Sequence, residues 1–368
     1  MKKIIQNSVL VVLTACVSFA SCKKEKPLSS FVTPLQPTNN QQLIPLGVLS
    51  IPREYVCAAT AGNKILFAGG ATQTGPSLIA SSRVDIYDTS THSWSTAELS
   101  RPQAGLIATS LGSKIYFVDG YINNSSRIDI YDASTNTWST AELSTGRCLL
   151  AAGSAANKIV FAGGVDPFGD KINIFDTSTN TWSTVNLNEP RAGMSATSID
   201  NKLFFSGGMR NSGEISNNVD IYDAAANVWS AIAMREPRYY HTSIAAANLL
   251  FWAGGYSSFD SDGELIANNS VEIYNITTGG RTHHQSTRNA FYATIINNTI
   301  LFFSAFYGTS HSIDVYDINT QTWSVRDISF SVPTAIGWPM SIIGSGNKIF
   351  LAEGLNGSNP SKIWKLEF

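Results

Sequence analysis

The amino-acid sequence predicts an all-β protein, and two observations support this. Its apolar runs are short, rich in β-branched and aromatic residues, and separated by clusters of Gly, Asn and Ser, whereas no stretch keeps the 3.6-residue period of an amphipathic helix. In addition, the segment "VDIYDAAANVW" at Val219 recurs along the chain with small changes. The fold is therefore expected to consist of one strand-rich unit used many times.

The repeated unit predicts the architecture. Successive copies carry an aromatic anchor 42 to 52 residues apart. The anchors are Tyr87, Tyr131, Phe175, Tyr222, Tyr274, Tyr316 and Trp364, which makes seven copies. Each copy has room for four strands, for example 242–246, 249–253, 271–274 and a weaker strand after residue 278. A period of this length with four strands is typical of a propeller blade, so we expect a seven-bladed β-propeller.

Three residue types recur at fixed places in the unit. A glycine pair follows the second strand, as at Gly69-Gly70, and an Asp follows each of five anchors, where a turn begins and backbone N–H groups need acceptors. Five tryptophans open the fourth strand, seven residues after the anchor: Trp94, Trp138, Trp182, Trp229 and Trp323. Their fixed position predicts that they pack between blades rather than stack on a ligand.

The two ends of the repeat region predict how the ring closes. The last copy stops at "SKIWKLEF" without a fourth strand, whereas "LIPLGVLSIPRE" at the start reads as a fourth strand without its blade. We expect residues 44–49 to pair with residues 362–368, because this pairing would remove the two open edges of the array.

These motifs resemble the kelch family, which has a Gly-Gly pair closing the second strand, an aromatic residue in the third, a Trp opening the fourth and "PR" before the next first strand. The resemblance covers residues 43–368 and includes the central domain of galactose oxidase. The alternative is a WD-repeat propeller, but the Gly-His and Trp-Asp dipeptides of that family are missing here.

The N-terminal segment predicts export and lipidation. Lys2 and Lys3 precede a short apolar run that ends at Cys22, which resembles the lipobox of bacterial lipoproteins. Cys16 is the competing acceptor, and a membrane-spanning helix is disfavoured because the run is shorter than the ~20 residues that a bilayer needs. We therefore expect a signal peptide at 1–21, a flexible tether at 22–42, and the propeller at 43–368, anchored by lipid to a membrane of the bacterial cell envelope.

Composition excludes several classes of partner and linkage. The net charge of -2 leaves no basic footprint for nucleic acid, and 43% hydrophobic residues suit a large folded core. Cys57 and Cys148 lie in repeats that are not neighbours, so a disulfide is not expected. We expect a monomer.

One face of the propeller is the expected site. The loop that enters each first strand and the loop that leaves each second strand lie at the same end of the blade, because these strands are antiparallel. The longest loops, at 71–82 and 256–269, lie on this face, and binding residues usually lie on such loops. Five arginines enter first strands there, each twelve residues before the first apolar position of the second strand: Arg53, Arg147, Arg191, Arg238 and Arg288. Gln103 and Gly337 stand at this position in the other two copies.

Two roles are open for these arginines. They could bond blades together, as matching arginines do in some kelch proteins, or they could bind an acidic sugar or peptide, since the guanidinium fork suits carboxylates. Tyr239, Tyr256 and Phe259 would add aromatic surface beside them.

The expected function is that of a non-catalytic binding module for a glycan or a protein segment. The alternative is a carbohydrate-active enzyme, resembling kelch-type sialate mutarotases or galactose oxidase. The five histidines form no ligand cluster in the sequence, and the loop carboxylates Asp260, Asp262 and Glu264 are only a weak calcium motif. We expect no cofactor and no metal.

Overall fold

The computed structural model describes residues 40–367, apart from 75–76, 119–124, 166–168, 287–291, 304–310, 331–338 and 354–360. The predicted signal peptide, Cys22 and nearly all of the predicted tether lie outside the described residues. Every regular element in the described part is a β-strand, as the sequence predicts. No helix in that part is long and apolar enough to cross a membrane.

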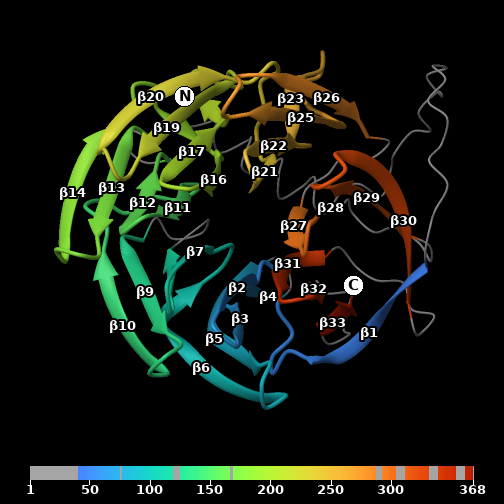
Figure 1. The fold of residues 1–368 in the computed structure, drawn as a ribbon. Helices are drawn as coiled ribbons and strands as arrows, with labels where there is room; N and C mark the ends of the chain where they lie inside the picture. The colour runs from blue at the N-terminus through green and yellow to red at the C-terminus, as the bar shows by residue number, and fades with distance from the viewer. Residues whose placement is uncertain are drawn as a thin grey trace.

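Seven four-stranded antiparallel blades surround a central axis (Figure 1). The first three blades are built as follows: blade 1 from β2 (Cys57–Ala61), β3 (Lys64–Ala68), β5 (Ser77–Asp88) and β6 (Ser93–Gln103); blade 2 from β7 (Ile107–Leu111), β8 (Lys114–Val118), β9 (Arg127–Asp132) and β10 (Thr137–Glu142); blade 3 from β11 (Ala151–Ala155), β12 (Lys158–Ala162), β13 (Lys171–Asp176) and β14 (Thr181–Asn186).

The remaining blades repeat this order, with one exception in the last. They are blade 4 from β16 (Ser195–Ile199), β17 (Lys202–Ser206), β19 (Asn218–Asp223) and β20 (Val228–Ala233); blade 5 from β21 (Thr242–Ala246), β22 (Leu249–Ala253), β25 (Ser270–Asn275) and β26 (Arg281–Gln285); blade 6 from β27 (Tyr292–Ile296), β28 (Thr299–Phe303), β29 (His311–Asp317) and β30 (Thr322–Phe330); blade 7 from β31 (Pro339–Ser345), β32 (Lys348–Glu353), β33 (Lys362–Glu367) and the N-terminal β1 (Asn40–Val48).

Strand β1 closes the ring in the predicted way. It pairs antiparallel with β33, with Ile44 opposite Lys365 and Val48 opposite Lys362. The first part of β1 also pairs parallel with β30 of blade 6, with Leu43 opposite Phe330. Blades 6 and 7 therefore share one eight-stranded sheet, a connection that the sequence did not predict.

The fixed spacing from anchor to Trp reflects the register of the third and fourth strands. In all five copies the Trp lies directly opposite the anchor, and the ring centroids are 4.7–5.1 Å apart. The Asp after the anchor accepts backbone N–H groups of the turn, as Asp176 Oδ1 does from Ser178 at 2.9 Å. The Asp in each of the other four copies accepts such a bond as well, so the sequence correctly predicted both the start of the turn and the acceptor for its N–H groups.

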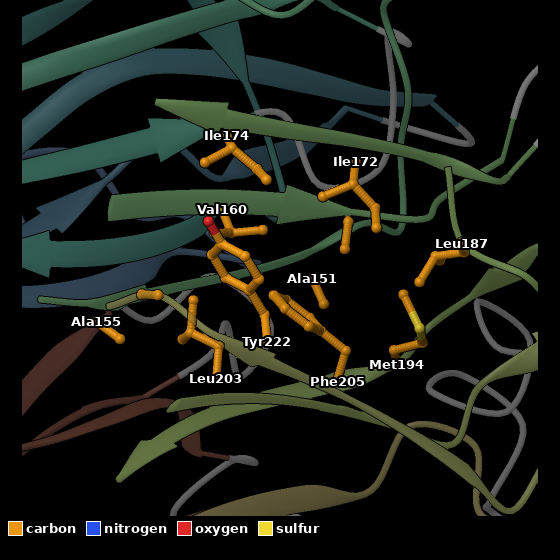
Figure 2. Packing of buried hydrophobic residues seen from close by; sticks show 12 residues of the cluster. Ala151, Ala155, Val160, Ile172, Ile174, Leu187, Met194, Leu203, Phe205 and Tyr222 are labelled. Atoms are coloured by element: carbon orange, nitrogen blue, oxygen red, sulfur yellow. The ribbon is translucent and has the colours of Figure 1, made fainter. Parts of the chain in front are cut away.

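The hydrophobic core is divided among the seven interfaces between neighbouring blades. One buried cluster joins each pair, and the last joins blade 7 to blade 1 through residues such as Phe350 and Ile65. Figure 2 shows the cluster between blades 3 and 4, where Phe205 and Tyr222 pack towards Val160 and Ile174. Four of the five tryptophans that open fourth strands take part in such clusters, as predicted, whereas the fifth, Trp182, remains 37% exposed.

The first strands form the innermost ring (Figure 1). Each contacts the next one along the chain, and β31 contacts β2. Small hydroxyl residues connect neighbours here: Ser154 Oγ donates to the Ser110 carbonyl at 2.6 Å, and Ser110 Oγ donates to the Thr60 carbonyl at 3.0 Å. The described first strands pair through backbone hydrogen bonds only within their own blades, so these side-chain bonds connect one blade to the next along the inner wall.

Candidate binding face

The predicted site lies on what we call the loop face, the end of the propeller that carries the linkers between blades and the loops leaving the second strands. Two small sheets stand on it outside the blade ladders, β15 (Arg191–Ala192) with β18 (Met209–Arg210) and β23 (Tyr256–Phe259) with β24 (Leu265–Ala267). In addition, β4 (Ala71–Thr74) pairs with the start of β5 and extends the sheet of blade 1. The long loops predicted from the sequence therefore carry strand structure of their own.

The linker arginines are buried. Arg53, Arg147, Arg191 and Arg238 are each 0–1% exposed, so their side chains present no accessible surface on the loop face. Arg288 lies outside the described residues. Burial lowers the pKa of Arg53 and of Arg147 to about 10, which still leaves both guanidinium groups charged at neutral pH.

Each arginine side chain bonds within its own blade. The Nη1 atoms of Arg53, Arg191 and Arg238 donate at 2.8–2.9 Å to the carbonyl of the first glycine of the pair. A side chain of the third strand accepts a further bond: Asp85 for Arg53, Asn173 for Arg147, Asp220 for Arg191 and Ser270 for Arg238. The guanidinium groups thus hold the second and third strands to the linker.

The main chain of the same residues bonds to the preceding blade. The carbonyl of Arg238 accepts the Gly208 N–H at 2.8 Å, and the carbonyl of Arg191 accepts the Gly164 N–H at 2.9 Å. The glycine pair makes this close approach feasible, because a Cβ on Gly207 would lie 2.2 Å from the Arg238 carbonyl oxygen. The side chains of these arginines therefore hold strands of one blade together, while their backbones join that blade to the preceding one.

Blade 2 departs from this pattern, since Gln103 stands at the arginine position. Gln103 is fully buried, and neither its Oε1 nor its Nε2 has a partner among the described residues. The matching carboxylate, Asp129, is 2% exposed and has an unpaired Oδ2. Burial raises the pKa of Asp129, although hydrogen bonds from Ser100 and the charges of Arg127 and Arg101 lower it.

The aromatic residues expected at the site are placed at different depths. Tyr239 is 2% exposed, and its backbone exchanges two hydrogen bonds of 2.9 Å with Tyr256, which is half-buried. Phe259, at the end of β23, is 37% exposed. Only Phe259 of the predicted set therefore offers a large accessible surface.

A second ring of residues on the loop face was not predicted. Two positions after the arginine position, the backbone is left-handed in blades 1 to 5: Tyr55, Gly105, Leu149, Gly193 and Tyr240. Their backbones connect neighbouring blades, since Gly105 N–H donates to Tyr55 O at 3.0 Å and Gly193 N–H donates to Leu149 O at 2.9 Å. The residue types vary too much for sequence reasoning to find the ring, although two of its members are glycine.

The histidine and cysteine residues that could serve in catalysis or metal binding are packed into the structure. His241 Nε2 lies 2.9 Å from Ser206 Oγ, and burial lowers the pKa of His241 to about 3. Cys57 and Cys148 are free thiols, as expected, and burial raises the pKa of Cys57 to about 12. No group of three or more His, Cys, Asp or Glu suited to a metal ion occurs among the described residues.

Comparison with known proteins agrees with this architecture. Residues 105–280 match the model of the KLHDC2/KLHL20/DRC7 Kelch-repeats domain. A comparison with curated proteins gave no match. The seven four-stranded blades and the matched repeats together support a kelch β-propeller. Propellers of this kind generally mediate binding or protein interaction.

Proposed function

We propose that the protein is a non-catalytic binding module whose loop face recognises a segment of a protein partner. The observation that supports this most directly is the contrast between the two faces. The opposite end of the propeller, the far face, has only short turns. The loop face carries two additional two-stranded sheets and the β4–β5 extension of blade 1, and Phe259 and Ile79 are exposed on these elements. Such protruding loops on a rigid scaffold are common binding elements. A glycan is the second class of ligand that this face would suit.

The module is proposed to act at the bacterial cell envelope, held there by a lipid on Cys22. The N-terminal sequence supports this, since it combines lysines, a short apolar run and a cysteine followed by charge. The same arrangement would leave the propeller free to meet partners at a distance from the membrane.

The test is a parallel screen of the purified chain against a library of short random peptides and a glycan array. Any ligand obtained is then measured against a variant in which residues 257–266 are replaced by a two-residue Gly-Ser turn. We expect peptide binding that this variant loses while its melting temperature is unchanged. Binding that survives in this variant and in one shortened at 72–79 would contradict a site on the loop face, and turnover of simple sugars would favour the enzyme alternative.

A further inference from the structure

The hairpin β23–β24, residues 256–267, stands apart from its blade. It forms a two-stranded sheet of its own, in which Phe259 lies opposite Leu265 and Ile266 lies opposite Ser258. Since neighbouring residues of a strand point to opposite sides, Phe259 and Ile266 lie on different faces of the hairpin. Both are accessible, at 37% and 44%. Apolar surface is therefore accessible on both faces of the hairpin, while its base is joined to the linker before blade 5 by the two backbone bonds between Tyr256 and Tyr239.

The tip of the hairpin is held in one conformation. Asp260 Oδ1 accepts the N–H groups of Asp262 at 3.0 Å and Glu264 at 2.8 Å, and the Asp260 N–H donates to the Glu264 carbonyl at 2.9 Å. Gly263 supplies the left-handed residue, with φ of 82°. A partner would therefore meet a preformed surface, which lowers the entropic cost of binding.

The charge of the hairpin is of one sign. Asp260, Asp262 and Glu264 are exposed, and residues 256–267 contain no Lys, Arg or His. Neither Asp262 nor Glu264 forms an ion pair with a described residue. These carboxylates are therefore not neutralised within the hairpin.

Neighbouring basic residues do not reverse this sign. Arg191 and Arg238 are buried and bonded inside their blades. Arg210 is engaged by Glu189 and Glu214, each at 3.0 Å. In the linker before blade 5, the exposed Arg235 is followed directly by Glu236, which is also accessible. Among the described residues, the accessible charge around the hairpin is thus negative, whereas the row of arginines suggested a site for an acidic ligand.

We propose that the acidic hairpin, residues 256–267, docks a protein segment that carries Lys or Arg next to an aliphatic or aromatic side chain. This inference rests on the proposed function and gives the partner its chemistry. The basic groups pair with Asp262 and Glu264, while the apolar side chain covers Phe259 or Ile266. Charge complementarity of this kind mainly sets the specificity and the rate of association.

The experiment selects short random peptides on the immobilised full-length chain at low ionic strength and sequences the enriched pool. Selection is repeated on two variants, the charge variant Asp262→Asn/Glu264→Gln and the apolar variant Phe259→Ser/Ile266→Ser. A matched control, Asp200→Asn/Val228→Ser, removes an exposed carboxylate on the far face and an exposed apolar residue on an outer strand. Melting temperatures are recorded for all four proteins.

We expect enriched peptides with net positive charge and at least one large apolar residue. Their affinity should fall about tenfold or more in both hairpin variants, stay unchanged in the control, and weaken as salt is raised. Enriched peptides that are acidic, or basic peptides that the hairpin variants bind equally well, would overturn this inference. Enriched peptides of any other composition, if the loop-shortened variants no longer bind them, would also overturn this inference but leave the proposed function intact. A selection that enriches no peptide would overturn both.

Discussion

At the scale of single residues, the linker arginines show how a repeated charge can be structural. The four described ones are buried, and their guanidinium groups bond to the second and third strands of their own blades. Repetition at a fixed position fits this task, because the same strands have to be held to the linker in each of these blades. The arginine that would mark a binding site in isolation is here part of the framework that holds the loops in place.

The first prediction compares two of these arginines. Arg191→Ala leaves Asp220 buried without its counter-charge, so it should lower the free energy of unfolding by about 3–5 kcal/mol. Arg147→Ala leaves the neutral Asn173, which keeps its bonds to Ser144 and Thr184, and should cost only about 1–3 kcal/mol. Urea denaturation of both variants measures the difference. Equal stability of Arg191→Ala and the parent protein, with weakened peptide binding, would instead support the ligand-binding role.

The second prediction concerns the missing arginine of blade 2. Gln103→Arg should pair with Asp129 and raise the free energy of unfolding by about 1–2 kcal/mol at neutral pH. Burial raises the pKa of Asp129 in the folded parent protein. Its protonated carboxyl therefore stabilises the folded state below the ordinary pKa of Asp, and this stabilisation is lost as the pH rises through the raised pKa of the folded state. The advantage of the variant should therefore shrink as pH falls. An advantage that is absent at neutral pH, or that grows in acid, would show that Asp129 is not the partner.

At the scale of the strand, a histidine joins blades 5 and 6 at the outer edge of blade 5. Among the described residues, it is the one histidine that stacks on a tryptophan of a neighbouring blade. His284 of β26 lies parallel to Trp323 of β30, with ring centroids 3.9 Å apart and an interplanar angle of 7°. Burial lowers the pKa of His284, Asp314 raises it, and His283 lowers it again. We therefore expect the stability of the joint between blades 5 and 6 to depend on pH.

The third prediction follows from this coupling. A histidine whose pKa is lowered by folding stabilises the folded state above its unfolded pKa of about 6.5, and this contribution is lost as pH falls through the lower folded value. The melting temperature should fall between about pH 7.5 and about pH 5, and His284→Phe should flatten this dependence. His92→Asn, at an exposed histidine in a turn of blade 1, is the control. An unchanged pH profile in His284→Phe would contradict the assignment to His284.

The sequence predicted elements better than it predicted surfaces. Strand period, the glycine pair and the seven-residue step from anchor to Trp are local patterns, so the blades and the turn bonds could be foreseen, as for 242–246 and 249–253. The depth of Arg191 or Tyr239 depends on contacts with another blade and could not. Likewise, the parallel pairing of Leu43 with Phe330 joins residues far apart in the chain, and no local pattern encodes it.

At the scale of the whole molecule, closure depends on one strand. Leu43 and Leu49 of the N-terminal segment are buried at 1–2% exposure, and β1 covers the edge of β33. Seven interblade cores then form an unbroken ring, in which each blade has two neighbours. Without β1, blade 7 would expose both a strand edge and an apolar surface.

The fourth prediction is that deletion of residues 43–50 unfolds or oligomerises the protein. It should lower the melting temperature and shift the chain from a monomer to larger species in size-exclusion chromatography with light scattering. Deletion of residues 23–30, which precede the described strands, is the matched control and should change neither property. A monomer that melts like the parent protein after loss of 43–50 would show that the ring does not need this closure.

The last prediction places the molecule at a membrane. If Cys22 is the acylated first residue, as we propose, β1 begins at Asn40, only a short stretch of chain after the lipid. An extended chain of that length spans at most about 60 Å, enough to hold the propeller near the bilayer while letting it reorient. Mass spectrometry of the mature N-terminus should find a diacylated or triacylated Cys22, and Cys22→Ser should move the protein from the detergent phase to the aqueous phase. Cys16→Ser is the control and should leave the modification in place. Acyl groups on Cys16, or cleavage without acylation, would refute the anchor at Cys22.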